Sequence, residues 1–316
     1  MAYVIIGATG HIGNNLVRFL VSKNEKVRVL ARRVDHNLKD IDIDYVVCNL
    51  FNKEDLKKNI HEKDIVINLM AIIDIKNKLK EETMHVNYEG CVLITDVCIE
   101  NKVSKYIYCS TVDAIYKPDS TSTIVEPDYI DCSKFKNNYP YTKGLATNYV
   151  IDKMKEKTDT LISIVYPSAV IGINDYKPSM IGKVVLDAIN GKMEFGVKGG
   201  YNFIDVDDVV SAIYSISSSD ISDTFILSGH NVSVIELYQM INKELNVKRK
   251  IVKIPMWVVR MACPFVPYLS KFTIETILEN HNYDSSKAKQ CLNWHLTPIE
   301  ETIKKTVQWF KENNQK

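Results

Sequence analysis

Mainly apolar segments alternate with amphipathic stretches through the first half of the chain. The apolar segments lie at 3–6, 26–30, 45–49, 64–71, 106–109 and 161–166. Such runs are typical of strands that are covered on both faces, whereas the stretches between them carry apolar residues at helical spacing. The pattern therefore predicts a doubly wound α/β fold with a parallel sheet, in which ligands bind at the carboxyl ends of the strands.

Helical spacing predicts helices at 14–22, 53–60, 82–101 and 137–157. From residue 166 onward the pattern is less regular, with helices expected at 180–190 and 233–245, a strand end followed by a helix at 204–215, and a last helix from Pro298. Asp207 and Asp208 are expected to cap the helix within 204–215. We therefore expect a dinucleotide-binding domain at 1–170 and a smaller substrate-binding part at 171–316, with 204–228 returning to the sheet.

Three glycines, Gly7, Gly10 and Gly13, follow the first strand directly and precede a helix. Glycines allow a tight turn and a close approach to a pyrophosphate, which would bind the free N–H groups at the positive end of the helix. A βα turn without a ligand is the alternative, but strand, turn and helix occur in the order that the dinucleotide motif requires. The cofactor-binding residues expected in this turn are Gly7, Thr9, Gly10, His11, Ile12 and Gly13.

The end of the second strand determines which nicotinamide cofactor is expected. Arg32 and Arg33 lie there, and arginine accommodates the 2′-phosphate of NADP, whereas a carboxylate selects NAD. Asp35 lies just beyond, so NAD is the alternative cofactor to NADPH. Further cofactor contacts are expected from Asn49, Leu50, Met70, Ala71 and Asn87. For Asn87 the alternative is a local hydrogen-bonding role, which is more common for an asparagine in a buried helix.

Two hydroxyl residues and a tyrosine–lysine pair follow the fifth strand. Ser110 and Thr111 end that strand, and Pro140 fixes the start of the next helix, which makes Tyr139 and Lys143 neighbours on one helical face. The same spacing recurs at Tyr149/Lys153 and at Tyr283/Lys287, so spacing alone is weak evidence. The order of the motifs selects Tyr139 and Lys143, with Thr111 favoured over Ser110.

Together these motifs resemble the extended short-chain dehydrogenases/reductases of the NAD-dependent epimerase/dehydratase superfamily, including dihydroflavonol reductases and 3β-hydroxysteroid dehydrogenases. The resemblance rests on the segments 7–13, 110–111 and 139–143 and continues through 68–71, Asn87, 166–172 and 203–208. It implies a Rossmann domain and a nicotinamide cofactor that is also held by Lys143 and faced by Pro167, Ala169 and Val170. It further implies Thr111, Tyr139 and Lys143 as the catalytic group.

The reaction implied is hydride transfer to a carbonyl carbon, with Tyr139 donating its phenolic proton to the oxygen. The ammonium of Lys143 and an oxidised nicotinamide are expected to lower the pKa of Tyr139 from its usual value of about 10. If Tyr139 were not the donor, Tyr141 would be the next candidate.

Only two arginines, Arg249 and Arg260, lie beyond residue 170, so few side chains there could bind a diphosphate with bidentate geometry, although lysines could act as point charges. The segment 253–270, with Trp257, Met261, Phe265 and Tyr268, is expected to form a lid or wall of an apolar pocket, because an interfacial membrane helix requires a more basic polar face. These features favour an NADP-dependent oxidoreductase that reduces a hydrophobic ketone or aldehyde. A nucleotide-sugar epimerase or dehydratase and a non-catalytic NAD(P)-sensing protein are the alternatives.

Composition narrows the range of partners. A net charge of +1 offers no electrostatic reason to expect nucleic acid or an anionic membrane as the main partner, and no run of about 18 apolar residues predicts a membrane span. The seven cysteines are scattered, which predicts reduced thiols in a cytoplasmic protein and no metal site. A small carbonyl compound is the expected partner, and a homodimer is left open.

Overall fold

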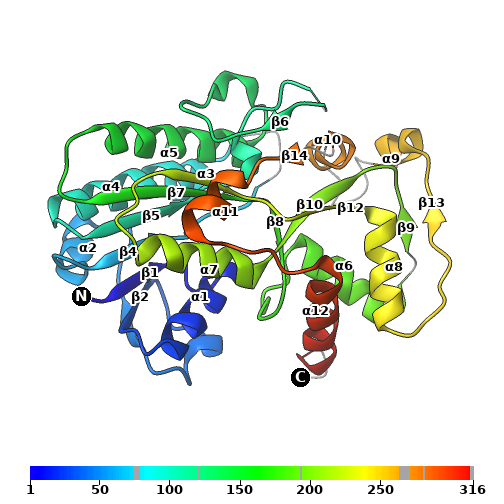
Figure 1. The fold of residues 1–316 in the computed structure, drawn as a ribbon, viewed down its shortest axis with the longest axis horizontal. Helices are drawn as coiled ribbons and strands as arrows, with labels where there is room; N and C mark the ends of the chain where they lie inside the picture. Colours follow the sequence, from blue (N-terminus) through cyan, green and yellow to red (C-terminus); the bar gives the residue numbers. More distant parts are fainter. Residues whose placement is uncertain (75–78, 120, 193, 263–270, 280–281, 314–316) are drawn as a thin grey trace.

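A seven-stranded parallel sheet forms the centre of the fold (Figure 1). The computed structural model describes residues 1–74, 79–119, 121–192, 194–262, 271–279 and 282–313. The strand order is β11 (Thr224–Leu227), β7 (Leu161–Pro167), β5 (Lys105–Cys109), β4 (Ile65–Asn68), β1 (Tyr3–Ile6), β2 (Val27–Ala31) and β3 (Asp44–Val47). Strand order reverses between β1 and β4, which opens a crevice at their carboxyl ends. The predicted doubly wound Rossmann sheet is confirmed.

Alternate residues of each central strand enter two separate cores. In β1, Val4 and Ile6 belong to one core, while Tyr3 and Ile5 belong to the other. The first core is completed by α2 (Lys53–Asn59), α4 (Gly90–Glu100) and α5 (Asn138–Lys155), and the second by α1 (His11–Ser22), α7 (Val206–Ser217) and α11 (Ser286–Leu292). Because both faces are covered, the strands read as continuous apolar runs.

A smaller part with its own core adjoins the sheet. Its three-stranded sheet contains β12 (His230–Ser233), β10 (Gly200–Asp205) and β8 (Ala169–Ile171), and its core lies among α6 (Met180–Ile189), α8 (Val234–Glu244) and α12 (Ile299–Asn313). The short strands β9 (Phe195–Gly196) and β13 (Val252–Lys253) pair with each other, as do β6 (Thr123–Ile124) and β14 (Asn282–Tyr283). Two further helices, α9 (Met256–Ala262) and α10 (Lys271–Glu279), follow β13. The division at residue 170 stays a prediction; β11 returns to the large sheet, whereas β10 joins the small one.

Two helices differ from the predicted ones in ways that affect the site. α1 begins at His11, three residues before the predicted start, so His11 and Ile12 belong to its first turn. The single helix predicted at 82–101 is instead α3 (Glu81–Met84), a wide π-helical turn at His85–Glu89, and α4. Asn87 lies within that wide turn, a feature that often occurs at functional sites.

The predicted cap of α7 is wrong. Asp205 is the N-cap residue, and its carboxylate accepts a hydrogen bond from the backbone N–H of Asp207 at 2.9 Å. Asp208 instead accepts hydrogen bonds from the backbone and the hydroxyl group of Thr297, at 2.8 and 2.7 Å. The sequence pattern located the start of the helix but misassigned the capping carboxylate by two to three residues.

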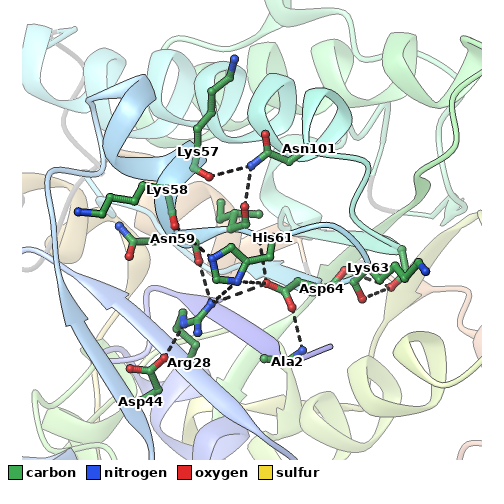
Figure 2. A network of polar contacts seen from close by, with 12 residues as sticks. Ala2, Arg28, Asp44, Lys57, Lys58, Asn59, His61, Lys63, Asp64 and Asn101 are labelled. Atoms are coloured by element: carbon green, nitrogen blue, oxygen red, sulfur yellow. Dashed lines mark hydrogen bonds and ion pairs between the residues drawn. The ribbon is translucent and has the colours of Figure 1, made fainter.

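A polar network closes the amino end of the sheet, opposite the crevice (Figure 2). The buried carboxylate of Asp64 accepts hydrogen bonds from the backbone N–H groups of Ala2, at 2.8 Å, and His61, at 2.9 Å. Arg28 pairs with Asp44 at 2.6 Å and donates to the carbonyl oxygen of Asn59 at 3.2 Å. These contacts fasten the first strand and the loop before β4, and they leave the carboxyl ends of the strands open for a ligand.

Within the part of the chain that the structure describes, no helix has the length and apolar character needed to cross a bilayer. The same residues contain no cluster of three or more His, Cys, Asp or Glu side chains arranged to hold a metal ion.

Candidate active site

The predicted catalytic group and most of the glycine turn meet in one cavity at the carboxyl ends of β1, β4, β5 and β7. The cavity has a volume of about 370 Å³. Of the predicted residues, its walls contain Gly7, Gly10, His11, Ile12, Gly13, Ala71, Thr111, Tyr139, Lys143, Pro167, Ala169 and Val170. Segments separated by more than 150 residues in the sequence therefore converge on one site.

The glycine turn has room for a ligand at one position only. A Cβ atom at Gly13 would lie 2.3 Å from the carbonyl oxygen of Gly7, and Gly7 itself has a φ of +91°. A Cβ atom at Gly10 would meet nothing closer than that same oxygen, at 3.4 Å. Packing within the protein therefore demands glycine at 7 and 13 but not at 10, where a glycine lets a ligand approach the backbone.

The start of α1 also fits the pyrophosphate of a dinucleotide. Gly10 is the N-cap residue and provides no side-chain hydrogen bond to the first turn. The first N–H groups of a helix lack intrahelical partners, and the helix dipole makes this end positive. This turn is therefore suited to bind phosphate oxygens, as the glycine pattern predicts.

His11 lies in this first turn and connects it to the smaller part. Its Nε2 lies 2.9 Å from the carbonyl oxygen of Ile173, to which the side-chain amide of Asn15 also donates at 2.9 Å. Burial lowers the pKa of His11, although Asp175 opposes the shift. Neutral imidazole is therefore favoured, and Nε2–H donates to Ile173.

Arg32 and Arg33 are exposed immediately after β2 and do not line the cavity. Since β2 is paired with β1, they follow the strand next to the one that ends in the glycine turn. The carboxylate of Asp35 is held by Lys177 at 2.7 Å and by the backbone N–H of Asn37 at 3.0 Å. The alternative ribose-binding carboxylate therefore already has protein partners.

Five other predicted cofactor residues, Thr9, Asn49, Leu50, Met70 and Asn87, also lie outside the cavity walls. Leu50 is buried in the core, and the Met70 side chain packs over Gly90. The Asn49 side chain accepts a hydrogen bond from the backbone N–H of Phe51 at 3.0 Å. The side chains of Asn49, Leu50 and Met70 thus have structural contacts.

Asn87 has three hydrogen bonds inside the protein. Its side-chain amide accepts from the backbone N–H of Ile72 at 2.7 Å and donates to the carbonyl oxygen of Ile72 and the hydroxyl of Thr142, both at 3.0 Å. Asn87 thereby connects the loop after β4 to α5. Its contact in α5 is Thr142, the residue before Lys143. The local hydrogen-bonding interpretation describes what its side chain does here.

The lysine and tyrosine of the predicted catalytic group are buried at the start of α5. Lys143 is 1% exposed; its Nζ donates to the carbonyl oxygen of Cys109 at 2.6 Å and lies 4.2 Å from the centre of the Tyr108 ring. Tyr139, one turn earlier, is 9% exposed. The hydroxyl of Ser110 is bonded to Thr147 at 2.6 Å, whereas Thr111 is hydrogen-bonded to Tyr139. This arrangement agrees with the choice of Thr111 over Ser110.

The expected lowering of the Tyr139 pKa is wrong for the protein by itself. Burial raises the pKa of Tyr139, the negative charge of Asp113 raises it further, and only the hydrogen bond with Thr111 opposes the shift. Burial also lowers the pKa of Lys143, whose Nζ is bonded to Cys109. Tyr139 is therefore held as a neutral phenol: the proton that a donor needs is present, but the phenol is a weaker acid than free tyrosine.

Several cavity residues were not predicted, among them Asp113, Ser168, Tyr201 and Asn202. Asp113 follows Thr111 by two residues, and its backbone N–H bonds to the Thr111 hydroxyl at 3.2 Å. Ser168 lies between two predicted residues, so the strand-end argument that identified its neighbours applies to it as well. Tyr201 and Asn202 arrive from β10, and no local motif marks them.

The predicted lid at 253–270 is only partly described, because Phe265 and Tyr268 lie outside the described residues. Trp257 and Met261 are described, and neither lines the cavity. They are 65% and 67% exposed to solvent. For these two side chains the prediction of a pocket wall is wrong, since apolar composition does not indicate which way a helix face is directed.

Comparison with known proteins identifies the family of this chain. Residues 3–224 match the model of the NAD dependent epimerase/dehydratase family. Sterol demethylase protein B of Methylococcus capsulatus is 23% identical over 330 residues, covering 99% of each chain, and a putative dihydroflavonol 4-reductase of Synechocystis is 25% identical, covering 98% of this chain and 95% of that protein. The fold matches UDP-glucose 4-epimerase from Thermotoga maritima, solved with UDP-glucose, with a TM-score of 0.82 and 19% identity over 99% of this chain and 100% of that one. The chain belongs to the NAD dependent epimerase/dehydratase family.

Proposed function

We propose that this protein is an NADP-dependent oxidoreductase that reduces a hydrophobic ketone or aldehyde. The observation that carries the proposal is the charge of the cavity walls. Among the described residues that line the cavity, Lys143 is the sole lysine and no arginine is present. Its Nζ is already bonded to Cys109, and His11 favours the neutral form.

A sugar nucleotide would need cations for its diphosphate, which arginine supplies best through paired hydrogen bonds. The substrate side of the cavity instead presents Ile73, Met180 and Ile181 beside Tyr201 and Thr276. An apolar lining with a few polar groups suits a hydrophobic carbonyl compound. The names of the sterol and dihydroflavonol relatives support the same class of substrate, whereas the likeness to UDP-glucose 4-epimerase concerns the fold.

The residues of this chain would have the following roles in the reaction. The glycine turn and the N-terminus of α1 would hold the cofactor pyrophosphate, and Arg32 would pair with a 2′-phosphate. The bound cofactor would supply a hydride. Thr111 would orient the carbonyl oxygen, and Tyr139, kept as a phenol by burial and by Asp113, would donate a proton to it. Lys143 would place the cofactor ribose and support Tyr139.

Consumption of NADPH by the purified protein tests the proposal, with aromatic aldehydes, steroid ketones and flavanonols as substrates and with UDP- and dTDP-sugars in parallel binding assays. Tyr139→Phe should reduce turnover by about 10²–10⁴-fold, the usual contribution of a positioned proton donor, while NADPH affinity changes only a few-fold. Tyr141→Phe is the matched control and should retain activity. Micromolar sugar-nucleotide binding without carbonyl reduction would defeat the proposal.

The pH dependence provides a separate check. Because the pKa of Tyr139 is raised in the folded protein, the phenol stays protonated throughout the neutral range. The rate constant kcat/KM for reduction should therefore show no decline from loss of this proton below about pH 10, the ordinary value for tyrosine. A decline between pH 6 and 8 that disappears in Tyr139→Phe would contradict the assigned direction of the shift.

A further inference from the structure

The elements β9, β13 and α9 lie at one end of the molecule (Figure 1), and four of their apolar side chains are exposed. Trp257 and Met261 lie one helical turn apart on α9, and are 65% and 67% exposed. Phe195 and Val252 are direct neighbours across the β9–β13 pair, and are 45% and 37% exposed. We call these four residues the α9 surface. None of them lines the active-site cavity.

The segment that contains β13 and α9 is basic. Residues 245–262 contain five basic residues and no acidic one, although the whole chain has a net charge of only +1. Arg249 is engaged, since it lies 3.5 Å from the buried Glu194. Lys248, Lys250, Lys253 and Arg260 are exposed, and none of these four has a salt-bridge partner among the described residues. Residues 245–262 are therefore strongly basic, although the net charge of the whole chain is close to zero.

We infer that the α9 surface docks the protein onto an anionic lipid bilayer. Trp is favoured at the boundary between headgroups and acyl chains, where its ring is buried and its N–H remains hydrated. Exposed lysines close to a membrane gain from the negative potential of anionic lipids. Exposed apolar anchors and exposed basic residues in one segment combine both contributions, and this inference does not depend on which substrate the enzyme reduces.

Charge also decides against a second copy of the chain as the occupant. In a twofold dimer the same patch faces itself, so the set Lys248, Lys250, Lys253 and Arg260 would face the same four basic residues of the other copy. Like charges brought together across an interface are repelled. An anionic headgroup layer supplies the opposite sign.

The sequence analysis did not predict a membrane-binding helix here, because α9 itself carries a single basic residue, Arg260. The other basic residues lie in the preceding segment at 248–253, which ends in β13, the strand paired with β9. A helical projection of α9 alone therefore misses most of the charge.

Binding of the full-length protein to vesicles tests the inference. We expect cosedimentation with vesicles of phosphatidylcholine and phosphatidylserine, weak binding to phosphatidylcholine alone, and release at high salt, because salt screens exposed charges. Tryptophan emission should shift to shorter wavelength on binding. The shift reports on Trp257, since Trp294 is buried and Trp309 packs between aromatic rings. Trp257→Phe should bind vesicles but lose the shift.

Two sets of substitutions separate the apolar from the charged contribution. The double variant Trp257→Ser with Met261→Ser and the triple variant Lys248→Gln, Lys250→Gln and Lys253→Gln should each weaken partitioning about tenfold or more. Matched controls replace equally exposed residues elsewhere and should bind like the wild type: Val125→Ser with Tyr129→Ser, and Lys39→Gln with Lys58→Gln and Lys304→Gln.

Three results would overturn the inference. The first is equal binding to neutral and anionic vesicles, and the second is unchanged binding by both test variants. The third is self-association, measured by light scattering, that the Trp257→Ser/Met261→Ser variant abolishes while vesicle binding is absent. That last result would identify the α9 surface as a contact between copies of the chain.

Discussion

Gly10 and Gly13 should respond in opposite ways to the same substitution by alanine. At Gly13 the added methyl group would lie 2.3 Å from the Gly7 carbonyl oxygen and 2.7 Å from the Cα atom of Ala8. Both are backbone atoms, so β1 and α1 must move apart. Overpacking of this kind costs about 1–3 kcal/mol. At roughly 2–4 °C for each kcal/mol, the midpoint of thermal unfolding of Gly13→Ala should fall by about 2–12 °C.

Gly10→Ala should leave the fold nearly unchanged. Gly10 has φ −84° and ψ 173°, which alanine adopts without strain, and its nearest neighbour would be 3.4 Å away. Alanine reduces the conformational freedom of the unfolded chain, which stabilises the folded protein by about 0.4–1 kcal/mol. Alanine is also a poorer N-cap residue than glycine, which costs a similar amount, so the two effects nearly cancel. The methyl group would nevertheless enter the cavity where the pyrophosphate is proposed to bind. Loss of one charge-assisted hydrogen bond, about 1.5–3 kcal/mol, would weaken NADPH binding at least tenfold.

Thermal unfolding without cofactor and titration of NADPH fluorescence measure both effects on the two variants and the wild type. The expected result is a stable Gly10→Ala protein with weak binding, beside a destabilised Gly13→Ala protein. Wild-type NADPH affinity in Gly10→Ala would refute the placement of the phosphates. An equal loss of stability in both variants would refute the steric argument that distinguishes the two glycines.

Two further substitutions test the cofactor choice and the support of the catalytic helix. Arg32→Ala should remove the preference for NADPH over NADH in fluorescence titrations while NADH affinity stays nearly constant; a wild-type preference for NADH would make Asp35 the determinant. Asn87→Ala should lower the free energy of unfolding by about 1–3 kcal/mol, because the Ile72 backbone groups and the Thr142 hydroxyl lose their shared partner. A thermal midpoint unchanged from wild type in Asn87→Ala would contradict this assignment.

The sheet and the glycine turn were predictable from the sequence because their signals are local. Strand β1, the turn at Gly7 and the start of α1 lie within a few residues of one another, and apolar periodicity distinguishes strand from helix over such short distances. The pairing of Tyr139 with Lys143 also follows from the helical repeat. The conformation within a helix is harder to predict, as the wide turn around Asn87 shows, since the apolar periodicity there is that of an ordinary helix.

Features that depend on packing between distant segments were beyond the sequence pattern. The pKa of Tyr139 rises because the fold buries the ring and brings Asp113 near it, whereas the sequence suggested only the influence of Lys143. Tyr201 reaches the cavity from a strand about 60 residues beyond Tyr139 in the chain. The exposure of Trp257 was likewise unpredictable, because an apolar side chain is equally compatible with a pocket wall and an outer surface.

One of the two edge strands of the large sheet, β11, is also its last strand in the sequence. Two strands of the smaller sheet, β8 and β10, come before it in the chain. Strand β11 pairs along β7 from Thr224 opposite Ile164 to Leu227 opposite Pro167. A chain cut near residue 170 would leave the hydrogen-bonding edge of β7 bare beside Val165 and Tyr166, and such edges recruit strands from other chains. The segment 1–170 is thus not a self-contained unit. Exchange of the segment after residue 170 between relatives would have to retain residues 224–227 to avoid aggregation.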